Sequence, residues 1–170
     1  QPTGVGLAVL GLVVLAGFIH WEMRTPSPVL DGSLFRANPG FTFSSVAALI
    51  HYAATFAVTF ILSLYLQNTK GLSPQQSGLV LVSQPAMMAL FSSLAGRLSD
   101  RLEPRILASM GMSVTTLGIF LFSFLRADTS TSIIMANLLM LGVGFAFFSS
   151  PNANAVMSAL DKRRLGVGSG

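Results

Sequence analysis

Residues 41–66 read FTFSSVAALIHYAATFAVTFILSLYL, and this stretch decides the fold class because it contains no Asp, Glu, Lys or Arg. A helix needs about 20 predominantly apolar residues to cross the hydrocarbon core of a bilayer. The stretch is long enough to do so with some tilt. A surface helix of a water-soluble protein would carry a charged face, which these residues do not supply. The stretch therefore predicts a membrane-spanning helix.

The same pattern extends along the rest of the chain. Charged residues make up only 9% of the 170 residues, whereas an ordinary globular protein has about 25%. No charge occurs in 1–21, 37–69, 71–96, 106–125 or 129–160. We therefore predict an all-α integral membrane protein with about five transmembrane helices. The predicted segments are a first helix over 1–21, a cytoplasmic loop over 22–40, and further spans over about 41–66, 73–95, 106–125 and 131–159.

The basic residues between these spans predict the orientation of the chain. Lys and Arg gather in cytoplasmic loops. With the loops 22–40, 97–105 and 161–164 inside, eight of the 10 basic residues are cytoplasmic, and only Lys70 and Arg126 are outside. These loops supply most of the net charge of +4, so the charge does not predict a nucleic-acid partner.

Several kinds of chemistry are excluded by the composition. The chain has no cysteine, so it forms no disulfide, thiolate nucleophile or Cys-ligated metal site. The predicted spans contain no charged residue, and intramembrane charges are what usually mark proton relays. An intramembrane enzyme would need paired acids, a Ser/His dyad or a metal cluster, and His51 is the only histidine in the interior of a span, because His20 lies at an interface. We predict no enzyme, no catalytic residue, no metal and no cofactor.

A polar stripe on the second span offers a candidate cavity wall. His51, Thr55, Thr59 and Ser63 recur every four residues, and Tyr52 lies beside them. One polar face on an apolar helix is typical of a helix that lines a water-filled cavity. Two alternatives stay open. The hydroxyls also satisfy themselves on their own helix or on a neighbour, and His51 is a candidate proton-coupling group.

Two further positions combine proline with polar side chains. Gln84 precedes Pro85 near the middle of the third span, and Pro151 precedes Asn152 in the fifth, which also contains Asn137. Proline removes a backbone hydrogen bond and kinks a helix, and kinked helices with polar groups line many transporter cavities. The alternative is a structural kink with amides that hydrogen-bond between helices.

Two local patterns predict packing and helix ends. Gly111, Thr115 and Gly118 form one stripe of small residues on the fourth span, while Gly142 and Gly144 lie in the fifth. Small residues let helices approach closely in lipid. Ser73-Pro74-Gln75-Gln76 predicts a capping box at the start of the third span, with Pro74 at the first helical position.

The most specific motif is GRLSDRLEPR, residues 96–105, which we place in the short loop between the third and fourth spans. Gly96 permits close helix approach, and Asp100 is positioned to form charge-assisted hydrogen bonds with Arg101 and Arg105. Such a loop is suited to hold two helical blocks in one state and release them in another. The alternative, a simple cytoplasmic anchor, explains the arginines but not the Gly-x-x-x-Asp-Arg spacing.

This motif resembles the signature of the major facilitator superfamily, Gly-x-x-x-Asp-Arg-x-Gly-x-Arg-Arg. The matching residues are Gly96, Asp100, Arg101 and Arg105, whereas Glu103 and Ile106 depart from it. Further stretches resemble the fourteen-helix drug:proton antiporter family within that superfamily. They include Tyr65-Leu66-Gln67, Gly71-Leu72-Ser73-Pro74, Gln84-Pro85, Gly142-x-Gly144 and Pro151-Asn152. The resemblance covers nearly the whole chain and implies that the five spans correspond to helices eight to twelve.

The resemblance implies a piece of a secondary active transporter. We expect a proton-coupled exporter of lipophilic or cationic small molecules, working by alternating access in the plasma (inner) membrane. Its N-terminal half, with the coupling carboxylates, and its last helices would lie outside this sequence. Its partners would be the substrate, the lipid bilayer and those missing helices. The signature residues would form a cytoplasmic latch, and the implied cavity wall is His51, Tyr52, Thr55, Thr59, Gln84, Asn137 and Asn152. The alternative is a non-transporting membrane scaffold or a membrane subunit of a larger complex.

Overall fold

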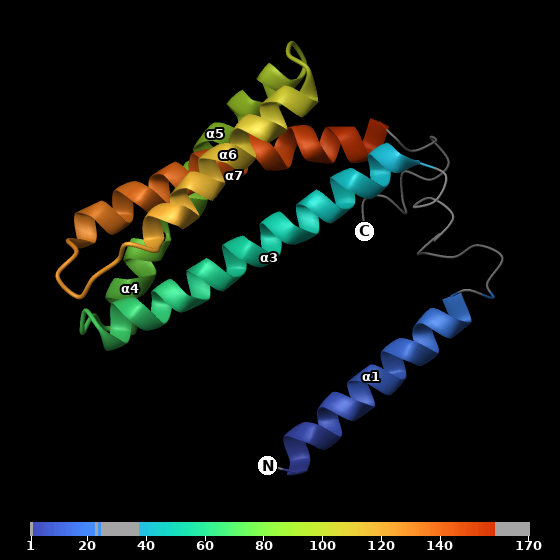
Figure 1. Cartoon of the computed structure of the whole chain (residues 1–170), viewed down its shortest axis with the longest axis horizontal. Coiled ribbons are helices and arrows are strands. Elements are labelled where there is room, and N and C mark those ends of the chain that lie inside the picture. Colours follow the sequence, from blue (N-terminus) through green and yellow to red (C-terminus); the bar gives the residue numbers. More distant parts are fainter. Residues whose placement is uncertain (1, 23, 25–37, 159–170) are drawn as a thin grey trace.

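The computed structural model describes residues 2–22, 24 and 38–158, and every regular element in this part of the chain is an α-helix. The helices are α1 (Pro2–Glu22), α3 (Pro39–Asn68), α4 (Pro74–Leu81), α5 (Ser83–Ser99), α6 (Pro104–Phe122) and α7 (Thr131–Ser158) (Figure 1). Most of the predicted loop 22–40 and the basic residues of 161–164 lie outside the described residues.

Four described segments are long and apolar enough to cross a membrane: 39–68, 74–99, 104–122 and 131–158, with α4 and α5 forming one of them. α1 contains a shorter apolar segment, Val9–Trp21. It stands apart from the other helices in Figure 1, and its large apolar side chains, such as Leu7 and Leu12, are exposed. The prediction of an all-α membrane fold is confirmed over the described residues.

The helix starts follow from local side-chain chemistry. At α3, the Asn38 side chain accepts a hydrogen bond from the Phe41 N–H at 3.1 Å, and Pro39 takes the first helical position. At α4, Ser73 Oγ accepts from the Gln76 N–H at 3.2 Å and Gln76 Oε1 accepts from the Ser73 N–H at 3.0 Å. The predicted capping box is thereby confirmed, and it satisfies amides that a helix start would otherwise leave unpaired.

The third span is broken where the sequence predicts a kink. α4 ends at Leu81, α5 begins at Ser83, and Val82 lies between them. Pro85 has no N–H with which to bond the carbonyl of Leu81, four residues earlier, so the helical ladder is interrupted at this turn. The Val82 and Ala86 amides still donate to Gly78 and Val82, which holds the two halves together.

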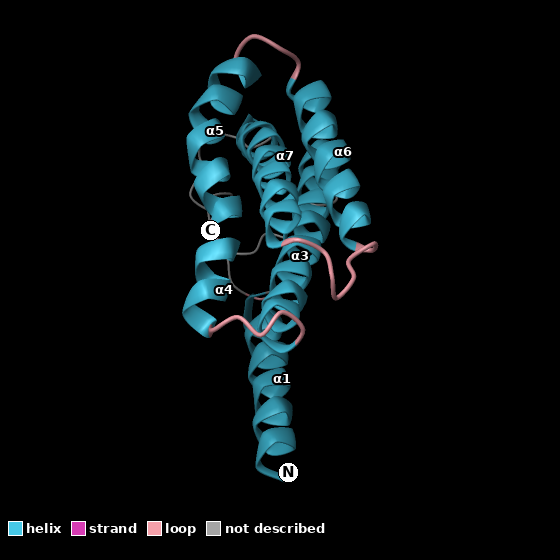
Figure 2. Cartoon of the chain, turned by 90° about the vertical axis from the view of Figure 1, so that its left-hand side faces the viewer, coloured by secondary structure: helices cyan, strands magenta, loops and turns pink. Residues whose placement is uncertain are grey.

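α7 is the central helix and lies between α5 and α6 (Figure 2). A Cβ built on Gly144 would lie 2.6 Å from Thr115 Oγ1 of α6, and one built on Gly142 would lie 2.4 Å from the Gln84 carbonyl oxygen of α5. Residues two apart in a helix point about 200° from each other. The pair Gly142 and Gly144 therefore lets α7 approach both neighbours closely, on opposite sides.

The two ends of the bundle are tied differently. At one end, Lys70 Nζ donates to the Ala127 carbonyl at 2.8 Å and the Tyr65 hydroxyl donates to the Arg126 carbonyl at 2.6 Å. At the other end, Asn154 Nδ2 of α7 donates to Ser99 Oγ of α5 at 3.1 Å. The first end contains the two basic residues that the sequence places outside, and the second contains the signature motif.

Candidate functional site

The candidate site is a crevice of about 390 Å³ between α3, the break of α4 and α5, and α7. Its walls are mainly apolar, with threonine hydroxyls and one amide among them. The lining residues are Thr55, Phe56, Thr59, Gly78, Leu81, Val82, Gln84, Pro85, Met88 and Phe145. The break before Pro85 thus forms one wall of the crevice, and three predicted cavity residues, Thr55, Thr59 and Gln84, come together in it.

The two threonines do not offer free hydroxyl donors to this crevice. Thr55 Oγ1 donates to the His51 carbonyl at 2.8 Å, and Thr59 Oγ1 donates to the Thr55 carbonyl at 2.9 Å. The hydroxyl protons are satisfied within α3, and the side chains still line a cavity wall, to which each oxygen presents its remaining acceptor capacity.

Gln84 is the polar group best placed to contact a ligand in the crevice. Only 8% of its surface is exposed, yet within the part of the chain that the structure describes its amide forms no hydrogen bond. Its backbone carbonyl lies against Gly142 of α7, where a Cβ would come within 2.4 Å of the oxygen. A primary amide carries both donors and acceptors, so Gln84 offers both to a molecule among apolar walls.

His51 and Tyr52 lie next to the crevice but do not line it. The His51 ring packs on Phe148 and Phe145 of α7, with centroid separations of 4.1 Å and 5.1 Å. His51 Nε2 is buried and finds no hydrogen-bond partner among the described residues. The Tyr52 hydroxyl lies 3.2 Å from Ser149 Oγ. Since Phe145 lines the crevice, this aromatic cluster adjoins the crevice and joins α3 to α7.

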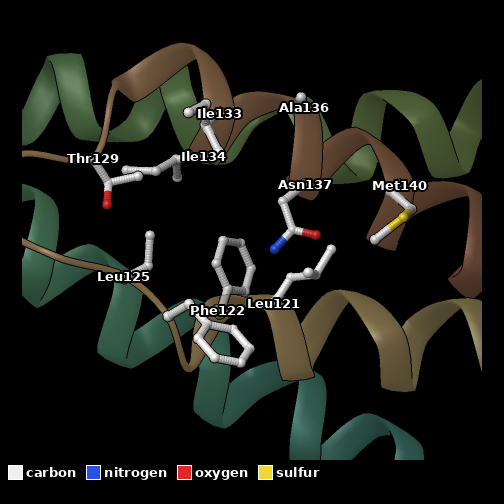
Figure 3. A pocket seen from close by; sticks show the side chains of 10 residues that line it. Leu121, Phe122, Leu125, Thr129, Ile133, Ile134, Ala136, Asn137 and Met140 are labelled. Carbon is white, nitrogen blue, oxygen red and sulfur yellow. The ribbon is translucent and has the colours of Figure 1, made fainter.

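The two asparagines predicted for the cavity lie in other places. Asn137 faces a separate pocket between α6 and α7 (Figure 3). Asn152 lines a groove of about 530 Å³ beside Arg105, where α3 and α6 begin and α7 ends. Five of the seven predicted cavity residues therefore lie in three separate sites, Thr55, Thr59 and Gln84 share one of these, and His51 and Tyr52 line none of the three.

The signature motif is more helical than the sequence predicts. α5 continues to Ser99 and α6 begins at Pro104, so Gly96 and Arg105 lie in helices and only residues 100–103 form the loop. A Cβ on Gly96 would meet Ser150 Oγ of α7 at 3.4 Å, which agrees with close helix approach. The expected charge-assisted bonds are not present: within the described residues Asp100 forms no ion pair with either neighbouring arginine, and all three side chains are exposed.

Several residues at the candidate site were not singled out from the sequence, including Phe56, Leu81 and Val82. Phe145 and Met88 line the crevice, and Ser149 pairs with Tyr52. Phenylalanine and methionine are frequent in this chain, and most of them suit lipid contact as well as a cavity. Only the position of Phe145 three residues before Phe148, on one face of α7, offers a sequence signal, and that signal needs the α3 partner to be interpretable.

Comparisons with known proteins give one consistent result. A family model described as the Major Facilitator Superfamily matches residues 3–170. The riboflavin transporter RibZ of Clostridioides difficile is 28% identical over 166 residues, covering 98% of this chain and 36% of RibZ. The uncharacterized MFS-type transporter YhcA of Bacillus subtilis is 30% identical over 163 residues, covering 96% of this chain and 30% of YhcA.

A third relative is named as a multidrug resistance protein. The multidrug resistance protein Stp of Mycobacterium tuberculosis is 26% identical over 153 residues, covering 90% of this chain and 28% of Stp. The chain thus spans 28–36% of the length of these three curated relatives. No solved structure matches the chain.

Proposed function

The chain belongs to the major facilitator superfamily, and on that premise we propose that it forms part of an exporter of small lipophilic molecules. Membership assigns the chain to multi-pass membrane proteins rather than to enzymes. In the proposal, two helical bundles rock about a central site. This chain supplies part of the second bundle, over residues 41–170, and the rest of the full-length protein supplies the remaining helices.

The single observation that carries the proposal is the crevice at the α4–α5 break. Small-molecule sites are mostly apolar cavities of about 300–1,000 Å³ with a few fixed polar groups. The crevice has this character, with about 390 Å³ of space, apolar walls and the amide of Gln84. Apolar walls select lipophilic compounds, and one unpaired amide adds directionality without fixing one structure. The name of the Stp relative, a multidrug resistance protein, agrees with such a wall.

The driving force in the proposal is proton entry. The four described spans contain no Asp or Glu, and carboxylates are the usual carriers in proton relays. The coupling carboxylates are therefore proposed to lie in another part of the full-length protein. His51 stays an alternative coupling group.

The signature residues Gly96, Asp100, Arg101 and Arg105 are proposed to act as a cytoplasmic latch between the two bundles. The exposure of the three charged side chains leaves them available to a partner bundle. In the full-length protein, Asp100→Asn or Arg101→Ala is expected to depress efflux with little loss of expression. Normal efflux by both variants would refute the latch.

Efflux from everted membrane vesicles containing the full-length protein tests the export proposal. Gln84→Ala is expected to weaken inhibition by compounds with hydrogen-bonding groups about three- to tenfold, the value of one hydrogen bond. Purely apolar compounds should be little affected. Gln75→Ala is the matched control, because Gln75 is exposed in the first turn of α4. An unchanged inhibition profile for Gln84→Ala argues against the crevice, and absence of efflux by the wild type favours the scaffold alternative.

A further inference from the structure

A second pocket lies between α6 and α7, at the end of the bundle that contains Arg126. Its volume is about 420 Å³, and it shares no lining residue with the crevice. Its walls are almost entirely hydrocarbon, as Figure 3 shows, and Asn137 projects between Leu121 and Met140. The lining residues are Leu121, Phe122, Phe124, Leu125, Thr129, Ile133, Ile134, Ala136, Asn137 and Met140.

Asn137 is an unusual residue for such a wall. Its Nδ2 donates to the Gly118 carbonyl of α6 at 2.9 Å, which fixes the orientation of the amide. Its Oδ1 is buried and has no hydrogen-bond partner among the described residues. Only 8% of the residue is exposed, so water has little access to this acceptor. A buried acceptor without a donor costs free energy, and more so where no water reaches it. A hydrogen-bond donor from outside the described residues would therefore stabilise this oxygen.

A water molecule is a poor candidate for that donor. Buried waters are stable where two to four polar groups hold them, whereas apolar cavities stay dry. The other hydroxyl on the wall, Thr129 Oγ1, already accepts from the Arg126 N–H at 2.9 Å. A water at Asn137 would thus have one partner and hydrocarbon around it. A molecule that is itself mostly hydrocarbon fits better.

We propose that this pocket binds a lipophilic molecule whose hydrocarbon body fills the apolar walls and whose single O–H or N–H donates to Asn137 Oδ1. Asn137 is six residues into α7, which is about 9 Å along the helix axis. In the predicted orientation α7 begins on the outer side, so Asn137 lies in the outer half of its span. Asn137 Oδ1 is covered in this structure, so the proposal requires side chains of the pocket wall to shift when the ligand binds.

Photolabelling of the full-length protein in phosphatidylcholine vesicles tests this site. The probe is a C16 alcohol with a diazirine in its chain, and the matched probe is its methyl ether, which has no donor. The alcohol is expected to label peptides containing Leu121–Leu125 and Ile133–Met140 about three- to tenfold more strongly than the ether. Equal labelling by the two probes, or no labelling of these peptides, would overturn the proposal. The second result would mean that another part of the full-length protein fills the pocket.

Two variants assign the effect to the pocket. Asn137→Leu is expected to lower alcohol labelling to the level of the ether and leave ether labelling unchanged, while Met140→Trp, which fills the cavity, lowers both. Unchanged preference for the alcohol in Asn137→Leu would also contradict the proposal. The comparison of the two probes on the wild type needs no variant, so it stands even if Asn137→Leu does not fold.

The same assay distinguishes the source of the ligand. Phosphatidylcholine has no hydrogen-bond donor, whereas phosphatidylglycerol has two hydroxyls. Competition by phosphatidylglycerol vesicles identifies a membrane lipid as the occupant, and competition only by added lipophilic alcohols or amines identifies a dissolved compound. Both results support the site. Labelling does not require transport, so its failure is distinguishable from failure of the export proposal.

Discussion

The face of α7 that meets α6 and the face that meets α3 are packed by different means. Toward α6, backbone meets backbone: a Cβ on Gly111 would lie 2.4 Å from the Phe148 amide nitrogen and 2.7 Å from the Gly144 carbonyl oxygen. Toward α3, rings meet rings, with His51 on Phe145 and Phe148. Lipid supplies little hydrophobic driving force between helices, so close backbone approach gives the tighter interface. The α6 side is therefore held by close backbone contact, whereas the α3 side is held by tilted ring contacts between side chains.

The largest expected effect comes from adding one methyl group to the tight side. Gly111→Ala places its Cβ against backbone atoms of Phe148, Phe147 and Gly144, which cannot rotate away. We expect a cost of about 1–3 kcal/mol or more, measured as a lower apparent melting temperature of the full-length protein in detergent. Gly78→Ala is the control, because nothing lies within 4 Å of a Cβ built there. Similar losses in both variants would show that the α6–α7 interface is not specially tight.

An intermediate effect is expected on the ring side. His51→Phe keeps the stacking on Phe145 and Phe148 and removes the unpartnered Nε2, so stability is expected to stay the same or rise by about 1 kcal/mol. His51→Ala removes the ring and is expected to lose about 1 kcal/mol of aromatic packing. Thermal unfolding of both variants checks this. A strong loss for His51→Phe would mean that Nε2 has a partner in the full-length protein, and loss of efflux without loss of stability would favour a coupling role.

The smallest effect is expected at Tyr52. Tyr52→Phe removes one hydroxyl contact to Ser149, at 3.2 Å, and interhelical hydrogen bonds in membranes average about 0.6 kcal/mol. Ser149→Ala should give the same small change, and the double variant should add nothing further if the two hydroxyls act only on each other. A change above about 2 kcal/mol in either single variant would mean that the α3 side is held more firmly than its geometry suggests.

Much of the fold follows from the sequence, because membrane spans obey simple rules. The absence of charge in 41–66 and the Ser73 capping box predict α3 and the start of α4, and Pro85 predicts the break. Gly111, Thr115 and Gly118 form a contact stripe because their spacing leaves them on one face. The helix ends are less predictable: the signature motif contains charges, which suggested a loop, but charged residues at a membrane surface are compatible with the last turn of α5 and the first turn of α6.

The candidate site is harder to predict for a physical reason. Periodicity shows which residues of one helix share a face, but not which other helix that face meets. Asn137, Asn152 and Gln84 look alike in sequence, as polar residues in apolar spans. They separate only when α7 is placed, because Asn137 turns to α6, Asn152 lies near the end of the helix and Gln84 packs against Gly142.

The paired glycines of α7 also bear on how the protein is made. α5 and α6 are consecutive and joined by residues 100–103, yet they lie on opposite sides of α7 (Figure 2). Before α7 is made, the surfaces at Gln84 and Gly111 lack the α7 backbone against which they pack in the structure. Helix insertion precedes helix association in the two-stage view of membrane folding. Close packing of α5 and α6 in this part of the bundle is therefore expected to be completed only when Gly142 and Gly144 of α7 are in place.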